Sequence, residues 1–303
     1  MKNKILNKIY SVSSVQEKKI KIFFSENPNM EKDLEEFLQL YKPYMDTENI
    51  TSDDVADAYI EMLGQMMYCR KEFNTTGEYL VKNQNQAFVE TYNNELLMTR
   101  YMIALALSQF LWKHHYEVFN FFKKTIIKVQ DNCNILEVGS GHGLLLLEAL
   151  KNIRQSKSFD VVDISPASIR MSKNVLNAID EEYLRKVNFY TTDINDFVTS
   201  KKYDFIIIGE VIEHVDDPLR ILKSLHNMLT DHGTVFMTTC ANCPTIDHVY
   251  HFKHIGEIQR LITDAGFVIS KEKIVPSVDN KSEKYIEQYK LDVIYAATIA
   301  KHN

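Results

Sequence analysis

Apolar and polar positions divide the chain into two regions with different periodicity. Up to about residue 125, apolar residues recur every three or four positions and long stretches lack glycine and proline, which predicts helices throughout. The segment Leu96 to Phe122 is the longest and most apolar of these predicted helices. Its aromatic residues from Phe110 to Phe122 are expected to pack between helices, with the lining of an apolar substrate pocket as the alternative.

Beyond Asn132, short apolar runs alternate with helical patterns. Strands are predicted at 134–139, 159–163, 187–191, 203–209, 234–239 and 291–300, with another beginning at Phe267. The alternation predicts βαβ crossovers and an α/β fold with a doubly wound, mostly parallel sheet, which a C-terminal antiparallel hairpin closes. We therefore predict an α-helical cap domain over residues 1–125 and an α/β domain over residues 126–303.

Composition excludes several classes of protein. The 303 residues are 45% hydrophobic and 25% charged, which excludes a disordered or fibrous chain. The net charge of −6 argues against a binder of duplex nucleic acid. Four cysteines are too few for a disulfide scaffold, and neither a secretory signal nor a membrane-spanning apolar stretch is evident. We expect a cytoplasmic protein without membrane contact.

A glycine-rich turn follows the first predicted strand. Its sequence places Glu137 before three alternate glycines, Gly139, Gly141 and Gly143, with Ser140 between the first two. Glycines at these positions allow the backbone to turn sharply and to approach a ligand closely. A dinucleotide fingerprint would need a third glycine at the position of Leu144, and no Gly-Lys-Ser/Thr ending of a Walker A loop is present.

The E-x-G-x-G-x-G pattern resembles motif I of the class I S-adenosylmethionine-dependent methyltransferases, and further motifs over roughly residues 130–270 follow in that family's order. The resemblance implies a Rossmann-like sheet, S-adenosylmethionine as cofactor and S-adenosylhomocysteine as product. It places Asp163, which Ile164 follows, at the position that binds both ribose hydroxyls. A carboxylate suits that task because it offers two acceptor oxygens to a vicinal diol.

Two further acids follow later strands at positions that the same resemblance assigns to the cofactor. It places Asp193 at the adenine amino group, with Ile194 against the ring. Glu210, after the fourth predicted strand, corresponds to the position beside the methionine moiety. Acidic groups at this rim suit a cationic sulfonium ligand that carries no phosphate.

Histidines follow the fourth and fifth predicted strands, and three interpretations of them stay open. In the first, His248 or His251 is a general base or orients the acceptor, with His214 a further catalytic candidate. In the second, Glu210, Glu213, His214 and His248 bind a metal, an arrangement that resembles the RNA 3′-terminal 2′-O-methyltransferases of the Hen1 type. In the third, the histidines are structural. We favour the first and expect chelators to have no effect.

Cys240 and Cys243 form a single C-x-x-C, with His248 and His251 beyond it. Four such residues are a zinc-ligand set, but we expect a packed pair of reduced thiols because Cys240 belongs to a buried strand end.

The predicted function is S-adenosylmethionine-dependent methylation of a small organic acceptor at O, N or C, in specialised metabolism. The helical N-terminal region is expected to close the acceptor site, and it is also a candidate homodimerisation arm. One alternative is a metal-dependent RNA 2′-O-methyltransferase. The other is a non-catalytic scaffold that binds S-adenosylmethionine.

Overall fold

The computed structural model describes residues 1–153 and 155–302, and within them seven strands form one sheet of order β3-β2-β1-β4-β5-β7-β6. The strands are β1 (Asn134–Val138), β2 (Ser158–Asp163), β3 (Val187–Thr191), β4 (Tyr203–Gly209), β5 (Leu229–Ala241), β6 (Phe267–Pro276) and β7 (Val293–Lys301). Strands β1 to β5 are parallel, whereas β7 is antiparallel to both of its neighbours. The predicted doubly wound sheet with a closing antiparallel hairpin is confirmed.

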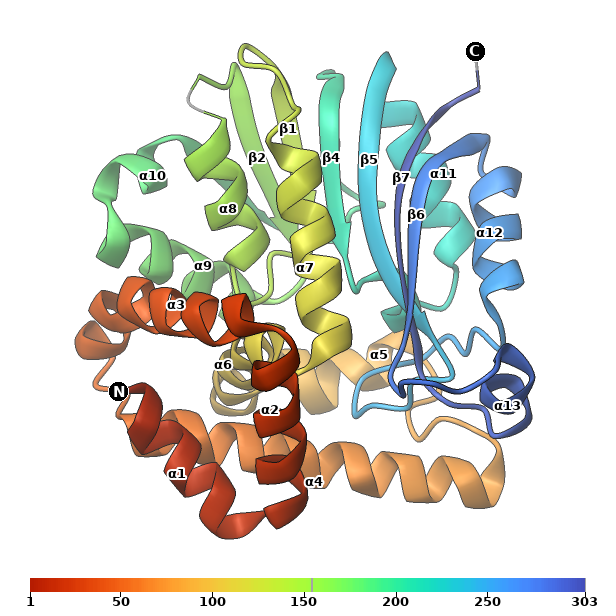
Figure 1. Ribbon diagram of the computed structural model, residues 1–303. Helices are drawn as coiled ribbons and strands as arrows, with labels where there is room; N and C mark the ends of the chain where they lie inside the picture. The colour runs from red at the N-terminus through yellow and green to blue at the C-terminus, as the bar shows by residue number, and fades with distance from the viewer. Residues whose placement is uncertain (154, 303) are drawn as a thin grey trace.

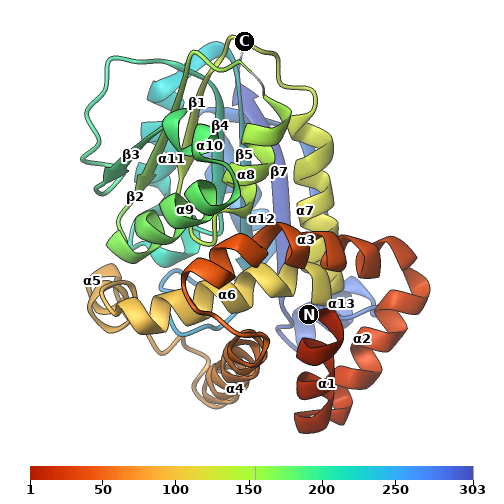
Figure 2. The same ribbon diagram turned by 90° about the vertical axis from the view of Figure 1, so that its left-hand side faces the viewer.

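Two hydrophobic clusters lie on opposite faces of the sheet, because successive side chains of a strand point to opposite sides. Ile135 belongs to the cluster that holds helices α7 (Lys113–Ile126), α8 (Leu144–Asn152) and α9 (Pro166–Ile179). Leu136 belongs to the cluster beneath α11 (Pro218–Met228) and α12 (Ile255–Asp264). Figure 2 shows α7 and α11 on opposite sides of the strands. The short elements are α10 (Glu181–Arg185), a 3-10 turn (Ile212–His214) and α13 (Glu283–Gln288).

The N-terminal helices gather below one end of the sheet, and α7 runs from them along its face (Figure 1). They are α1 (Lys2–Val12), α2 (Ser14–Glu26), α3 (Pro28–Thr47), α4 (Ser52–Thr76), α5 (Gln84–Ala87), a π-helix (Phe88–Tyr92) and α6 (Glu95–Leu111). The Tyr41 hydroxyl donates to the His142 carbonyl, which places α3 at the glycine-rich turn. This end therefore contains the carboxyl end of β1, where the ligand site was predicted.

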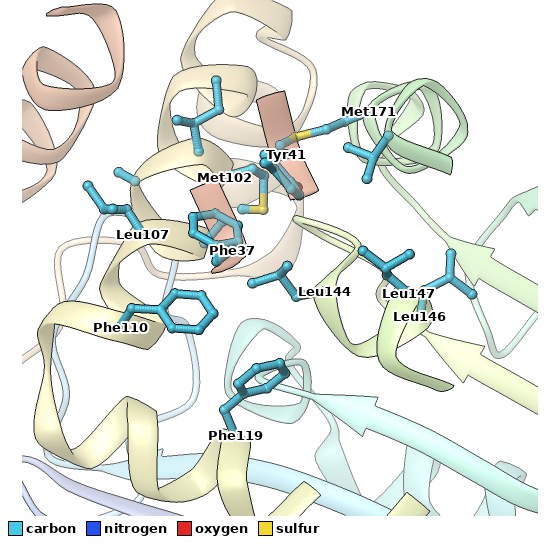
Figure 3. Packing of buried hydrophobic residues seen from close by; sticks show 14 of the residues in the cluster. Phe37, Tyr41, Met102, Leu107, Phe110, Phe119, Leu144, Leu146, Leu147 and Met171 are labelled. Atoms are coloured by element: carbon cyan, nitrogen blue, oxygen red, sulfur yellow. The ribbon is translucent and has the colours of Figure 1, made fainter. Parts of the chain in front are cut away.

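Aromatic and aliphatic side chains join the two predicted regions. Phe37 of α3 and Phe110 of α6 stack with ring centroids 4.6 Å apart, and Figure 3 shows Met102 and Phe119 close by, with Leu144 of α8. The expected packing of aromatic residues between helices is thus present. One hydrophobic cluster crosses residue 125, and the division into domains there stays a prediction.

The single helix predicted over 96–122 is wrong, because the chain leaves helical geometry at Trp112 (φ −114°, ψ 125°) and forms α6 and α7. The Trp112 indole N–H donates to the Tyr59 hydroxyl across 2.6 Å, so a tertiary contact fixes the break. Helix α6 is apolar on most sides and largely buried. Neither α6 nor any other helix of the described residues is long and apolar enough to cross a membrane.

Candidate functional site

A cavity of about 240 Å³ lies between the strand ends and the N-terminal helices. Eleven of the residues singled out from the sequence line it: Glu137, Gly139, Ser140, Gly141, Asp163, Ile164, Asp193, Ile194, Glu210, His214 and His248. Gly143 and His251 are not part of the lining. The fold thus brings most of the predicted cofactor positions and two of the three predicted catalytic histidines to one place.

The glycine-rich turn has the backbone geometry that only glycine adopts easily. Gly139 has φ +75°, and a Cβ there would overlap Cγ2 of Val211. Gly143 has φ +74° and is the residue that precedes α8. The absence of a side chain at Gly139 therefore leaves room for Val211, whereas Gly143 allows the sharp turn into α8.

Asp163 holds the glycine-rich turn against the end of β2. Its Oδ2 accepts hydrogen bonds from the backbone N–H groups of Ser140 (2.9 Å) and Gly141 (3.4 Å), and its Oδ1 accepts from that of Ser165 (2.8 Å). Burial raises the pKa of Asp163, and these hydrogen bonds oppose that rise because they stabilise the ionised form. The carboxylate, which belongs to the cavity lining, thus fixes the backbone of the glycine-rich turn through these hydrogen bonds.

Glu137 is a buried acid whose hydrogen-bonding capacity is unused. It is 1% exposed, and neither of its carboxylate oxygens has a hydrogen-bond partner among the described residues. Burial, reinforced by the negative charge of Asp163, raises its pKa well above the ordinary value. Because an unpaired buried carboxylate is costly, the position fits a ligand that brings a cationic or N–H donor group into the cavity.

Residues 84–92, here called the 84–92 strap, connect the N-terminal helices to the rim of the cavity. The Gln84 amide donates to Asp193 Oδ2 (3.1 Å), and the Gln84 backbone N–H donates to Asp216 Oδ1 (3.2 Å). At the other end, the Tyr92 carbonyl accepts from the Ser165 hydroxyl (3.2 Å). The strap includes the π-helix, a rare geometry that is frequent at functional sites.

His214 and His248 pack edge-on against each other in the cavity lining, with ring centroids 4.7 Å apart. His214 Nδ1 lies 2.8 Å from the Tyr92 hydroxyl oxygen and 3.1 Å from the Asp247 carbonyl oxygen. His248 Nδ1 lies 2.6 Å from the Cys243 carbonyl oxygen. Burial lowers the pKa of His248 to about 3, so this ring is neutral near pH 7.

Glu213 is fully buried, and its Oε1 lies 4.0 Å from His214 Nε2. Its Oε2 accepts from the Thr239 hydroxyl (2.7 Å), while its Oε1 has no partner among the described residues. Burial and the neighbouring Glu210 raise the pKa of Glu213 well above its ordinary value. Glu210 itself has φ +50°, a strained backbone geometry for a residue with a side chain, and its carboxylate faces the cavity.

His251 lies outside the cavity lining, although His248, only three positions earlier, is part of it. Its Nε2 lies 2.9 Å from Asn242 Oδ1, and its ring packs edge-on against Phe73 at 5.0 Å. The loop between β5 and α12 is irregular there and bends at Tyr250, and the Tyr79 ring lies beside both histidines, with centroids 6.2 Å from His248 and 4.8 Å from His251. The cysteines are free, and burial raises the pKa of the Cys240 thiol, as expected for reduced thiols.

The lining that the N-terminal helices contribute is mostly apolar. Helices α4, α6 and α7 line the cavity with Met66, Met98, Tyr101, Met102, Leu105, Val118, Phe119 and Phe122. Gln109 and His115 add polar groups, and the His115 Nδ1 is 2.8 Å from the Ser108 hydroxyl. Some of the N-terminal aromatic residues therefore line the pocket while others are core.

The model of a family described as a methyltransferase domain matches residues 111–272. The chain belongs to this family. The class I S-adenosylmethionine-dependent methyltransferase family that the motifs predicted is thereby confirmed, with S-adenosylmethionine as the cofactor.

Two curated relatives are similar to part of the chain. Malonyl-[acyl-carrier protein] O-methyltransferase 1 of Ilyobacter polytropus is 35% identical over 109 residues, which are 36% of this chain and 38% of that protein. A ubiquinone biosynthesis O-methyltransferase of Xanthomonas campestris pv. campestris is 27% identical over 112 residues, 36% of this chain and 44% of that protein. The chain thus spans less than half the length of these relatives.

A solved structure with the same fold is that of the [4+2]-cyclase SpnF. Its TM-score is 0.50 at 11% identity, over 63% of this chain and 85% of that one. At this identity the likeness shows the fold alone.

Proposed function

We propose that this protein transfers the methyl group of S-adenosylmethionine to a small, largely apolar organic acceptor. The observation that carries the proposal is one cavity lined both by the glycine-rich turn with its acids and by apolar side chains of the N-terminal helices. The two relatives named above are O-methyltransferases, which supports oxygen as the acceptor atom.

The acids at the strand ends fit the cofactor's polar groups. Glu137 has two free acceptor oxygens for the amino group of the methionine part, and Asp163 lies where the ribose hydroxyls would be bound. Asp193, held by Gln84, would face the adenine amino group, with Ile194 against the ring. When bound, S-adenosylmethionine would supply an electrophilic methyl group on a sulfonium sulfur.

The chain's own contribution to catalysis is positioning. Apolar walls from α6 and α7 would exclude water and hold the acceptor in line with the methyl group, which supplies much of the rate enhancement for such a transfer. For a protonated acceptor, His214 or His248 would accept the proton, because both rings line the cavity. His251 would stabilise the loop through Asn242 and would not contact the acceptor, since it lies outside the cavity lining.

The same fold also occurs in a cyclase, so the fold does not settle the activity. A non-catalytic scaffold therefore stays the second candidate. The net charge of −6 supports a small-molecule acceptor over nucleic acid. The N-terminal helices would close the acceptor site, because the 84–92 strap contacts both Asp193 and Ser165.

Calorimetry with S-adenosylmethionine and a turnover assay for S-adenosylhomocysteine test this proposal together. We expect binding in the micromolar range, as is common for enzyme substrates, and turnover with hydroxylated apolar acceptors. Binding without turnover over a broad acceptor panel would support the scaffold. Absence of cofactor binding by the folded protein would overturn both candidates.

A further inference from the structure

Two histidines of the cavity lining, His115 and His142, have no role in the proposed methyl transfer. His115 belongs to the first turn of α7, and His142 lies in the glycine-rich turn, two positions before α8 begins. Helices α7 and α8 pack against each other, and both begin at the end of the sheet where the N-terminal helices gather (Figure 1). The two histidines therefore lie on the same side of the cavity.

Both imidazole rings are neutral near pH 7. Burial lowers the pKa of His142 to about 4. Burial also lowers the pKa of His115 well below its ordinary value, and the nearby rings of His114 and His142 add to this effect. A neutral imidazole has one nitrogen that donates a hydrogen bond and one that accepts, so the neighbours of each ring decide which nitrogen does which.

The start of α8 fixes the tautomer of His142. The backbone N–H of Leu144, the first residue of α8, has no carbonyl partner within its own helix. It donates instead to His142 Nδ1 across 3.2 Å. Because Nδ1 accepts this hydrogen bond, the ring hydrogen lies on Nε2, and His142 offers a donor at that atom.

Helix α6 fixes the opposite tautomer of His115. The Ser108 hydroxyl donates its hydrogen to the Leu105 carbonyl across 2.7 Å, so its oxygen, 2.8 Å from His115 Nδ1, accepts from that nitrogen. The Gln109 amide nitrogen lies farther from the same Nδ1, at 3.4 Å, so the Ser108 contact decides the tautomer. The ring hydrogen of His115 is therefore on Nδ1, and its Nε2 offers an acceptor.

Neither Nε2 atom has a hydrogen-bond partner among the described residues, and neither is enclosed by protein atoms, so both are accessible from the cavity. An unpaired donor and an unpaired acceptor in a mostly apolar lining are unfavourable until a ligand pairs with them. We propose that His115 and His142 form a subsite for an uncharged group of the acceptor that both donates and accepts a hydrogen bond, such as a hydroxyl or a carboxamide. This inference rests on the proposed function, because it assigns the subsite to the acceptor.

The charges of the cavity lining favour a neutral group over an anion at this subsite. The described residues that line the cavity include five acids, Glu137, Asp163, Asp193, Glu210 and Asp247, and neither a lysine nor an arginine. A carboxylate only accepts hydrogen bonds, so it would pair with His142 and leave His115 Nε2 facing a second electron-pair donor. The subsite therefore selects neutral acceptors against acidic ones of the same shape.

The test titrates the full chain near pH 7 with three probes of nearly equal shape: benzamide, acetophenone and benzoate. Benzamide donates and accepts hydrogen bonds, acetophenone only accepts, and benzoate is an anion. Fluorescence of Trp112, the only tryptophan of the sequence, reports binding because its ring centroid is 4.8 Å from that of His115. We expect benzamide to bind about tenfold more tightly than either analogue, the difference that one hydrogen bond makes.

Three variants connect this preference to one nitrogen atom. His115→Phe keeps an aromatic ring but removes the acceptor, so benzamide should lose its advantage over acetophenone. His115→Gln keeps an acceptor oxygen and should retain most of that advantage. His114→Phe is the matched control, because His114 is the neighbouring histidine outside the cavity lining, and it should discriminate like the wild type. Circular dichroism confirms that each variant folds.

Equal affinity of the wild type for benzamide and acetophenone, or a preference for benzamide that persists in His115→Phe, would overturn the proposal. Each titration is repeated with excess S-adenosylhomocysteine, which should leave benzamide binding unchanged. Loss of benzamide binding under that condition would assign the subsite to the cofactor and overturn its assignment to the acceptor. A preference that depends on His115 in a protein that never binds S-adenosylhomocysteine would reject only the proposed function.

Discussion

The hydroxyl oxygen of Tyr92 lies 2.8 Å from Nδ1 of His214, although the two residues are 122 positions apart. Through its carbonyl, Tyr92 also accepts a hydrogen bond from Ser165 beside the end of β2. One residue of the N-terminal helical region therefore touches both His214 and the N-cap residue of α9 after β2, two separate parts of the cavity lining. This contact makes the helical region part of the site.

Tyr92→Phe removes the hydroxyl and leaves His214 Nδ1 with the Asp247 carbonyl alone. Because this contact fixes the His214 ring at the cavity wall, we expect methyl transfer to slow about tenfold, measured as S-adenosylhomocysteine formation at saturating cofactor. Tyr116→Phe, which removes the hydroxyl that donates to Asp33 outside the cavity lining, is the control and should keep wild-type turnover. Unchanged turnover in Tyr92→Phe would show that the hydroxyl does not orient His214.

Asp163→Asn keeps the size of the side chain but removes its charge and one acceptor oxygen. Hydrogen bonds to a charged group contribute roughly 1.5–3 kcal/mol, so we expect S-adenosylmethionine affinity to fall about tenfold to a hundredfold. Calorimetry measures this loss, with circular dichroism to confirm folding. Wild-type affinity in the folded variant would remove Asp163 from the cofactor site.

Glu137→Gln tests whether the raised pKa of this buried acid makes protein stability depend on pH. The pKa of Glu137 is raised in the folded protein, so the folded state binds more protons than the unfolded state above pH 4.5. Protonated Glu137 should therefore stabilise the folded wild type at low pH. This stabilisation should be lost as the pH rises. Urea unfolding at several pH values should show the variant gaining stability over the wild type with rising pH.

The same substitution should weaken S-adenosylmethionine binding, because an uncharged amide attracts the cofactor's amino group less than a carboxylate does. A variant with wild-type affinity would place that amino group elsewhere in the cavity.

Gly139→Ala should abolish cofactor binding, because the added Cβ overlaps Val211 and φ is +75°. Gly64→Ala is the control, since a Cβ there meets no atom within 4 Å in the middle of α4. The control should gain about 0.5–1 kcal/mol of stability from helix propensity and keep its affinity. Thermal unfolding and calorimetry on both variants separate the two effects.

The sheet and the glycine-rich turn could be predicted because their signals are local. Buried strands such as Tyr203–Gly209 are nearly continuous apolar runs, and the positive φ values of the turn require glycine. The strand ends then placed Asp163, Asp193 and Glu210 at one edge of a parallel sheet. Their roles toward the cofactor stay predictions.

Long-range contacts are what the sequence could not show. Trp112 breaks a helix without glycine or proline because its indole reaches Tyr59, and no local pattern encodes that hydrogen bond. The hydrogen bond between Gln84 and Asp193, which are 109 positions apart, is likewise a tertiary contact that no local pattern encodes. His251 and His248 share a loop, but His251 lies outside the cavity lining, where it contacts Asn242 and Phe73, and no local pattern encodes those contacts.

Three of the apolar side chains that line the cavity are methionines: Met66, Met98 and Met102. Each has three rotatable bonds and a polarisable sulfur, so such a wall adjusts its shape at little energetic cost. We therefore expect tolerance among related acceptors of different outline. The same thioethers make this wall sensitive to oxidants, because a sulfoxide would turn a pliable apolar surface into a polar one.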